Sequence, residues 1–334
     1  MRPERALYKT KAGRRKKTMA LVTMKRLFDH AMKEKYTVGA YNVFNLDTLV
    51  AVLQAAEKED SPVIVQLSMG SRKYQPYFET FVRCVKLYAE AVHVPVGLNH
   101  DHCKTVENAK EAIDYGIPSV MFDGSHLPFE ENVASTREIV RYAHECGAWV
   151  EAELGKMAGF EDEIFAESTQ FTDPHQAAEF IRLTGCDSLA VSVGTSHGGV
   201  AGDSSLKLHF DVLEAIRSAI PESYPLVLHG AASVPEELVR AINAQGAHVP
   251  QMRNCTEADI SASAAYGVVK ANMDVDNHLC YSAAIRQKLG EITEKYDPRM
   301  YLKPAREAFE TEVRHKMKNV SQSSGKNWLK ENAE

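Results

Sequence analysis

The sequence predicts a single-domain α/β protein built as a parallel, eight-stranded (β/α)8 (TIM) barrel. Short β-rich runs alternate with longer amphipathic segments eight times, and polar residues collect at the carboxyl end of nearly every predicted strand. This alternation is typical of parallel sheets with helical crossovers, and eight repeats in one chain are typical of a barrel. A doubly wound sheet is the alternative, but no G-x-G-x-x-G motif follows the first strand.

Eight runs rich in apolar and β-branched residues are predicted as strands. They cover residues 37–44, 62–68, 94–101, 119–125, 149–155, 188–194, 225–230 and 267–274. Amphipathic segments between them include residues 45–60, 105–116 and 173–185. Each of these begins near Asn, Thr or Asp and ends near Asp or Gly, which are the residues that favour helix caps, so we predict crossover helices there.

The composition is that of a globular protein, with 44% hydrophobic residues, 25% charged residues and a net charge of −6. No apolar run is long enough to cross a bilayer, so no membrane partner is expected. Six cysteines are spread along the chain without a CxxC pair. This pattern fits neither a disulfide framework nor a zinc ribbon, and it favours a reducing, cytoplasmic location.

The amino-terminal segment 1–18 differs from the rest of the chain. It has eight basic residues and one acidic residue, so residues 19–334 carry a net charge of about −13. A basic arm can bind nucleic acid, but the acidic remainder argues against that partner. We expect 1–18 to be a disordered extension and 19–334 to be the barrel domain with carboxyl-terminal helices.

The polar strand ends predict where the site lies, because the carboxyl ends of barrel strands meet at one mouth. Singly, each of these residues could be a satisfied core polar group, but packing does not explain why all of them lie at the same end. They are Asn42, Ser68, Asp101, His102, Asp123, Glu151, Glu153, His229, Asn272 and Asp274.

Three histidines near these ends, His102, His197 and His229, form a candidate metal site. Three imidazoles with an open fourth position are typical of catalytic zinc, which must be free to polarise a carbonyl. His100 is an alternative ligand, because strict alternation puts His100 and His102 on one face and Asp101 on the other. Asp101 and His102 can share a site only where the strand becomes irregular. Cys103 could also bind metal, although a structural cysteine is the simpler interpretation.

Long segments of the chain resemble the ordered motifs of class II fructose-bisphosphate and tagatose-bisphosphate aldolases. The resemblance extends from about Leu21 almost to the end of the chain. The segments that carry it are PVGLNHDHC, SVMFDGSHLPFEEN, VEAELGKMAGFEDE, SLAVSVGTSHG, PLVLHGAAS, GVVKANMDVD and DPRMYLKPAREAFETEVRHKMK.

The resemblance implies a role for each matched residue. His102, His197 and His229 would hold Zn²⁺, with Glu153 as an alternative or neighbouring ligand and Asp123 at a second metal position. Asp101 would exchange the proton of the C4 hydroxyl, Glu161 would exchange the proton at C3, and Asn272 would contact the enediolate. The remaining matched residues would bind substrate, and these are Asn42, Ser68, Gly198, Gly230, Ser233 and Asp274.

The resemblance also implies partners and a substrate. A sugar phosphate would be cleaved, with fructose 1,6-bisphosphate as the default and tagatose bisphosphate or a C1-monophosphate as alternatives. A monovalent cation, Na⁺ or K⁺, would lie beside the phosphate, and the enzyme would be a homodimer or homotetramer. This chemistry needs such residues, because retro-aldol cleavage leaves electrons on a ketone that a divalent metal can stabilise while side chains move the protons.

Four positions depart from the family pattern. Ala232 stands where the family usually has Ser, Val275 where it has Thr, His278 where it has an Arg that reaches a distal phosphate, and Asn99 where it has His. The metal and proton-transfer residues are intact, so the departures bear on the substrate and leave the aldol chemistry in place.

Two alternative functions fit parts of the sequence. One is a Schiff-base aldolase on the same fold, with Lys270 of the last strand as a desolvated nucleophile. The other is a non-catalytic relative that only binds metal. The three histidines argue against the first, and Asp101 and Glu161 argue against the second.

Overall fold

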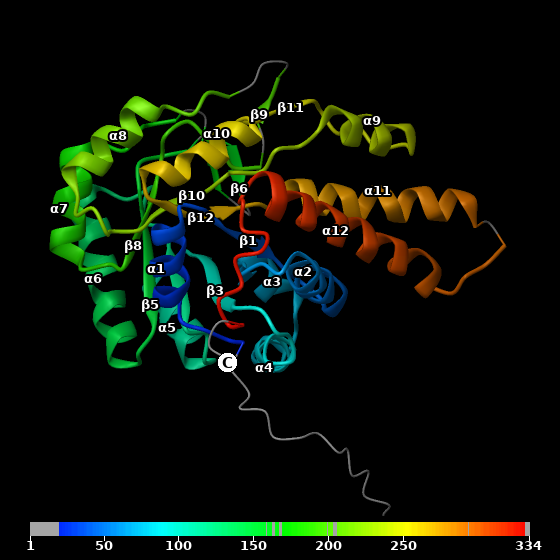
Figure 1. The fold of residues 1–334 in the computed structure, drawn as a ribbon, viewed down its shortest axis with the longest axis horizontal. Coiled ribbons are helices and arrows are strands. Elements are labelled where there is room, and N and C mark those ends of the chain that lie inside the picture. Colours follow the sequence, from blue (N-terminus) through cyan, green and yellow to red (C-terminus); the bar gives the residue numbers. More distant parts are fainter. Residues whose placement is uncertain are drawn as a thin grey trace, which may run out of the picture.

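The computed structural model describes residues 20–330, except 158, 162–163, 167–168, 199, 203–205 and 293. The extension predicted at 1–18 lies outside these residues. Eight parallel strands close into a barrel in the order β1-β12-β10-β8-β5-β4-β3-β2. Figure 1 shows this barrel with helices around it. The strands are β1 (Val38–Asn42), β2 (Val63–Leu67), β3 (Val96–Cys103), β4 (Ser119–Phe122), β5 (Trp149–Leu154), β8 (Ser188–Val191), β10 (Leu226–Leu228) and β12 (Val268–Asn272). All eight predicted strands are confirmed.

Helices between the strands join each strand to the next around the barrel, and α11 and α12 follow the last strand. They are α2 (Leu46–Glu59), α3 (Met69–Tyr74), α4 (Phe78–Ala89), α5 (Val106–Asp114), α6 (Phe129–Glu145), α7 (Pro174–Thr184), α8 (Phe210–Ala219), α9 (Glu236–Ala244), α10 (Glu257–Ala262), the 3₁₀ turn η1 (Ser263–Tyr266), α11 (Val275–Glu291) and α12 (Arg299–Asn319). Within the described residues, every helix is too short or too polar to cross a lipid bilayer.

Local capping chemistry starts the predicted crossover helices. The side chains of Asn45, Thr105 and Asp173 each accept a hydrogen bond from the backbone N–H three residues later, at the starts of α2, α5 and α7. Each bond satisfies a backbone donor that has no partner within the helix. Gly185 ends α7 in the left-handed conformation, which glycine adopts without a steric cost.

The amino ends of the strands are closed by α1 (Met24–Glu34). Leu27 and Phe28 of this helix are buried in a cluster with Val38 of β1, Ile64 of β2 and other side chains. A Cβ on Gly97 would meet the end of the Leu27 side chain at 2.6 Å, so a larger residue there would displace that side chain. Because α1 closes one end, the carboxyl ends of the strands form the accessible mouth.

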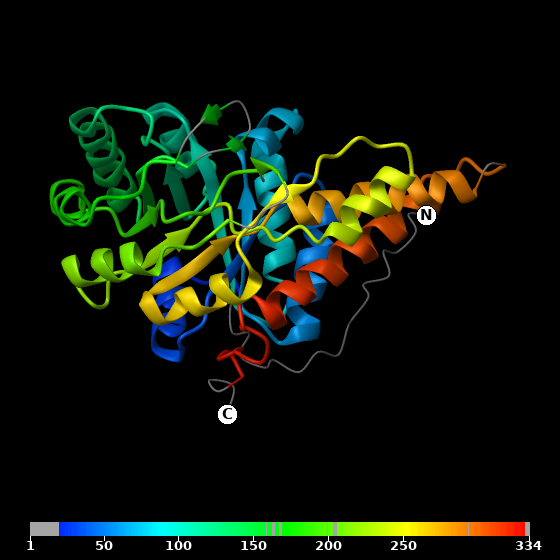
Figure 2. The same cartoon turned by 90° about the horizontal axis from the view of Figure 1, so that it is seen from above.

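Two features extend from the barrel. Helices α11 and α12 pack antiparallel as an arm that projects to one side, with α9 lying beside α11 (Figures 1 and 2). Two short antiparallel ribbons, β6 (Gly159–Glu161) with β7 (Ile164–Ala166) and β9 (Val200–Ala201) with β11 (Met252–Arg253), lie in the connections that follow β5, β8 and β10. The prediction did not include α3 or these ribbons, because runs of two to six residues are too short for periodicity to identify.

Candidate active site

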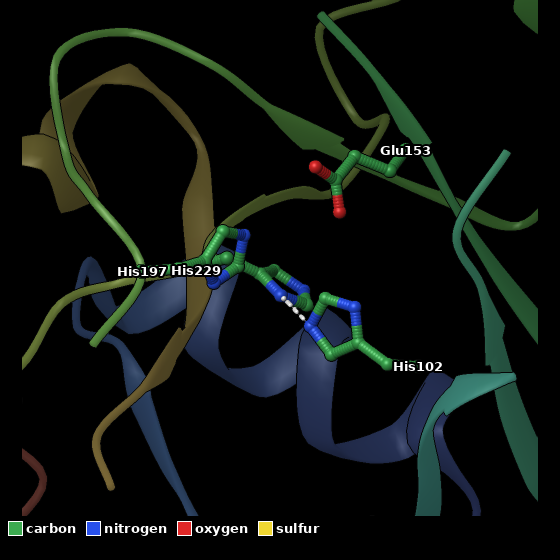
Figure 3. A group of neighbouring side chains, drawn as sticks. All are labelled: His102, Glu153, His197 and His229. Atoms are coloured by element: carbon green, nitrogen blue, oxygen red, sulfur yellow. Dashed lines mark hydrogen bonds between the residues drawn. The ribbon is translucent and has the colours of Figure 1, made fainter. Parts of the chain in front are cut away.

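Four side chains converge at the mouth of the barrel: His102, Glu153, His197 and His229. Each offers one ligand atom, and these atoms all lie within 4.8 Å of one another. Figure 3 shows the three imidazoles side by side, with the Glu153 carboxylate turned toward them. His102 and His229 are buried, as is Glu153, and His197 is partly exposed. Imidazole nitrogens and a carboxylate oxygen in one small volume are a donor set that fits zinc.

An irregular residue in β3 places both Asp101 and His102 in the site. His102 has a φ of 47°, which is the left-handed region, and the register between β3 and β4 shifts between His100 and Cys103. Regular alternation would put His100 and His102 on the same face of the strand. Because alternation is lost at His102, its side chain enters the site and that of His100 does not. The His100 ring instead contacts Phe78, and its Nδ1 lies 3.2 Å from the Cys103 thiol. His100 and Cys103 therefore lie in the packing between strand and helices.

The hydrogen bonds of His229 determine which of its nitrogens faces the cluster. Its Nε2 lies 2.8 Å from a carboxylate oxygen of Glu151, which can only accept, so Nε2 carries the proton. Its Nδ1 lies 2.8 Å from Nε2 of His102 and is left as a lone pair toward the cluster. Burial lowers the pKa of His229 and keeps the ring neutral, which is the form that binds metal.

Glu151 is held in turn by Lys270. The Lys270 ammonium lies 2.8 and 2.9 Å from the two Glu151 carboxylate oxygens, and both residues are buried. Burial opposes ionisation of Glu151, but the charge of Lys270 and the hydrogen bond from His229 outweigh it and lower its pKa to about 2. Lys270 is therefore held in a fully enclosed ion pair and does not line the cavity in the described structure. This geometry argues against a Schiff-base nucleophile.

Asp123 lies behind His102 rather than in the four-residue cluster. Its carboxylate is 3.6 Å from Nδ1 of His102 and accepts hydrogen bonds from the Ser125 backbone and hydroxyl. Burial alone would raise the pKa of Asp123, but these partners hold it well below its usual range. A carboxylate on the far nitrogen of a ligating histidine orients the ring and makes it a stronger ligand.

A cavity of about 430 Å³ opens beside the cluster. It receives most of the residues predicted to bind substrate or move protons. Its lining comprises Asn42, Phe44, Ser68, Gly70, Ser71, Tyr74, Asp101, His197, Gly198, Gly230, Ala232, Asn272, Asp274, Val275 and His278. Two residues predicted to bind substrate or move protons are not among these lining residues. The Glu161 side chain lies outside the described residues, and Ser233 turns its hydroxyl away, toward Glu257.

Asp101 and Asn272 form a polar pair in the cavity wall. The Asn272 amide donates to one Asp101 oxygen at 3.2 Å. The other Asp101 oxygen and the Asn272 carbonyl oxygen are buried without a hydrogen-bond partner in the described part of the chain. Buried polar atoms are nearly always bonded, so these two acceptors indicate a position for a ligand.

The outer wall of the cavity is aromatic. The Phe44 ring makes edge contacts with the rings of Tyr74 and His278, and Nε2 of His278 lies 3.3 Å from the Asp274 carboxylate. The described lining contains no lysine or arginine. Arg72 is nearby in sequence, but it pairs with Glu111. The described part of this wall therefore consists of aromatic rings and a histidine, without a lysine or arginine to bind a phosphate.

Sequence reasoning placed Glu151 among the polar strand ends but gave it no role, and it did not identify Phe44 or Tyr74 as cavity residues. A signal existed for Glu151, because it lies two residues before Glu153 on one strand and so faces the same side. No such signal existed for the aromatic pair, since Phe44 follows β1 and Tyr74 ends α3, and the two rings meet only when the chain folds.

Comparison with known proteins agrees with this geometry. The family model of class II fructose-bisphosphate aldolase matches residues 22–326. The chain belongs to the class II fructose-bisphosphate aldolase family. It is 40% identical to the fructose-bisphosphate aldolase of Treponema pallidum (strain Nichols), over 93% of this chain and 98% of that protein. It is 39% identical to the fructose-bisphosphate aldolase of Giardia intestinalis, over 87% of this chain and 90% of that protein.

A solved structure of an aldolase has a similar fold. The crystal structure of the YdjI aldolase from Escherichia coli K12 matches with a TM-score of 0.72 and 30% identity, over 92% of this chain and 99% of that one. Family membership makes this class II aldolase a lyase with a (β/α)8 barrel, and a metal-site cluster of histidine and glutamate lies at its mouth.

Proposed function

We propose that this class II aldolase binds Zn²⁺ and reversibly cleaves fructose 1,6-bisphosphate to dihydroxyacetone phosphate and glyceraldehyde 3-phosphate. The observation that carries the proposal is the convergence of three imidazoles and Glu153 beside a cavity that contains the buried Asp101 carboxylate. The names of the curated relatives support the same reaction. When bound, zinc supplies Lewis-acid polarisation of the substrate carbonyl.

The proton transfers are assigned to this chain's own carboxylates. Asp101 takes the proton of the C4 hydroxyl during cleavage and returns it during condensation, and its free oxygen supports this role. Asn272 orients Asp101 through their hydrogen bond. Glu161 handles the proton at C3 from the connection after β5. Positioned groups of this kind contribute about 10²–10⁴-fold each.

The phosphate of the dihydroxyacetone half is assigned to the glycine-bearing loops after β8 and β10. Gly198 and Gly230 both line the cavity and have positive φ, which exposes backbone N–H groups without a side chain in the way. Asn42, Ser68 and Asp274 line the same cavity and would bind substrate hydroxyls. A monovalent cation, Na⁺ or K⁺, beside this phosphate stays a prediction.

A second candidate substrate is favoured by the aromatic outer wall. His278 cannot grip a distal phosphate through two parallel hydrogen bonds as an arginine does. A ketose phosphate that bears its phosphate at C1 alone therefore competes with fructose 1,6-bisphosphate. Tagatose bisphosphate differs from fructose 1,6-bisphosphate only in its configuration at C4 and carries the same distal phosphate, so this wall does not favour it. Both candidates share the metal site and Asp101.

A homodimer or homotetramer is proposed for the assembly. The arm formed by α11 and α12 projects from the barrel (Figure 2). Leu289 of α11 is 50% exposed, and Tyr296, in the connection between the two helices, is 95% exposed. We propose that another subunit covers these apolar side chains. Light scattering coupled to size exclusion measures the assembly directly.

Metal removal combined with a substrate panel tests the function. Prolonged treatment with EDTA should abolish cleavage of every ketose phosphate, and added zinc should restore it in proportion to the metal bound. Full activity in protein shown to be free of metal would contradict the zinc mechanism. Cleavage of fructose 1,6-bisphosphate, fructose 1-phosphate and tagatose 1,6-bisphosphate, each coupled to dihydroxyacetone phosphate detection, identifies the substrate.

A further inference from the structure

The loop after β10, residues 230–233, is held tightly on its inner side. Gly230 and Ala232 line the cavity where the substrate phosphate is proposed to bind. Gly230 has a φ of 59°, and a Cβ there would meet the Ser196 carbonyl oxygen at 2.3 Å. The loop after β10 therefore packs backbone against backbone on the loop after β8. Any side chain at position 230 would push these two loops apart.

The outer side of the same loop is held through Ser233. Its backbone N–H donates to Asp276 at 3.1 Å, its hydroxyl donates to Glu257 at 2.9 Å, and its carbonyl accepts from Lys316 at 3.1 Å. All three polar groups of Ser233 are thus used outside the cavity. Ser233 anchors the loop to helices α10, α11 and α12.

Lys316 is the centre of this anchor. Its ammonium is fully buried and lies 3.0 Å from Asp276, 3.1 Å from Glu257 and 3.1 Å from Glu312. Asp276 is also fully buried and follows Asp274 and Val275, which line the cavity. Lys316 therefore joins the loop after β10 to the segment after β12, and both of these line one wall of the cavity. Lys316 belongs to α12, which does not line the cavity.

From this geometry we propose that Lys316 is a positioning residue for the substrate phosphate. It acts through Asp276 and Ser233, and the inference rests on the proposed function of the cavity. Without the ammonium, three carboxylates would face one another and the Ser233 carbonyl would lose its donor. An uncompensated buried charge is strongly unfavourable, so the carboxylates would separate and release the loop. The affinity for phosphorylated ligands should then fall more than the turnover of bound substrate.

Lys316→Met tests the proposal, with Lys318→Met as a matched control. Lys318 is on the same helix, is exposed and lies 3.6 Å from Glu59. In Lys316→Met we expect KM for the preferred ketose phosphate and the inhibition constant of inorganic phosphate to rise about tenfold or more. We expect kcat to change less, and zinc content to stay at the wild-type level. Lys316→Arg should recover part of the phosphate affinity, and the control should behave as wild type.

Hydrogen exchange separates this inference from the proposed function. The backbone amides of residues 230–233 should exchange faster in Lys316→Met than in the control, whatever reaction the enzyme catalyses. If Lys316→Met does not fold, Asp276→Asn decides, because it removes the ion pair and keeps an acceptor for Ser233. A folded variant with wild-type exchange and a wild-type phosphate inhibition constant would overturn the proposal. Wild-type enzyme that is inactive on all phosphorylated ketoses would instead overturn the function.

Discussion

Replacing Lys270 by methionine separates the two aldolase chemistries and measures the buried ion pair behind the metal site. Lys270 bonds both oxygens of Glu151, and Glu151 holds His229. Lys270→Met keeps a side chain of similar length but leaves the Glu151 carboxylate buried without its cation. Breaking a buried pair in this way costs about 3–5 kcal/mol.

The expected change in melting temperature follows from the size of the chain. An unfolding entropy of about 2.1 cal/mol/K per residue gives about 0.7 kcal/mol/K for 334 residues. A loss of about 3–5 kcal/mol therefore lowers the midpoint of thermal unfolding by about 4–7 °C. The double variant Glu151→Gln/Lys270→Met removes both charges and keeps an acceptor for His229, so it should regain most of this loss.

Activity and trapping complete the assay. A residue behind a metal ligand typically contributes about 10–100-fold to metal affinity or activity, so Lys270→Met should stay active when saturated with zinc, at a rate reduced by about that factor. Borohydride added with substrate should leave no covalent adduct on wild-type enzyme. An adduct on Lys270, together with complete loss of activity in the double variant, would refute the reasoning. An unchanged melting temperature in Lys270→Met would refute the stability argument.

Two further substitutions test the cavity. Asp101→Ala should lower kcat by about 10²–10⁴-fold with zinc content unchanged, because Asp101 moves a proton and lies outside the ligand cluster. Loss of zinc from that variant, measured by metal analysis, would make Asp101 a ligand. His278→Arg should raise kcat/KM for fructose 1,6-bisphosphate relative to fructose 1-phosphate by about tenfold, because arginine can bind the distal phosphate through two hydrogen bonds. An unchanged ratio would show that another group, such as one from Arg72 or Lys73, already fills this role.

Local sequence patterns were enough to predict the barrel. Strand runs such as 62–68 and helices such as 173–185 depend on interactions within a few residues, namely the periodic burial of apolar side chains and caps such as Asp173 and Gly185. The order of the long motifs then identified the family. The convergence of His102, His197 and His229 also follows from the sequence, because barrel closure brings strand ends to one mouth.

Only the tertiary structure decided how the individual side chains are used. The left-handed backbone at His102 lets Asp101 share its site, and no pattern in the sequence marks that conformation. Ser233 faces outward because Lys316, 83 residues away, holds it there. Such contacts depend on the closure of the barrel and on the packing of distant helices. Sequence periodicity reports which face of an element is buried, but the partner that each polar atom meets is settled only when those elements pack together.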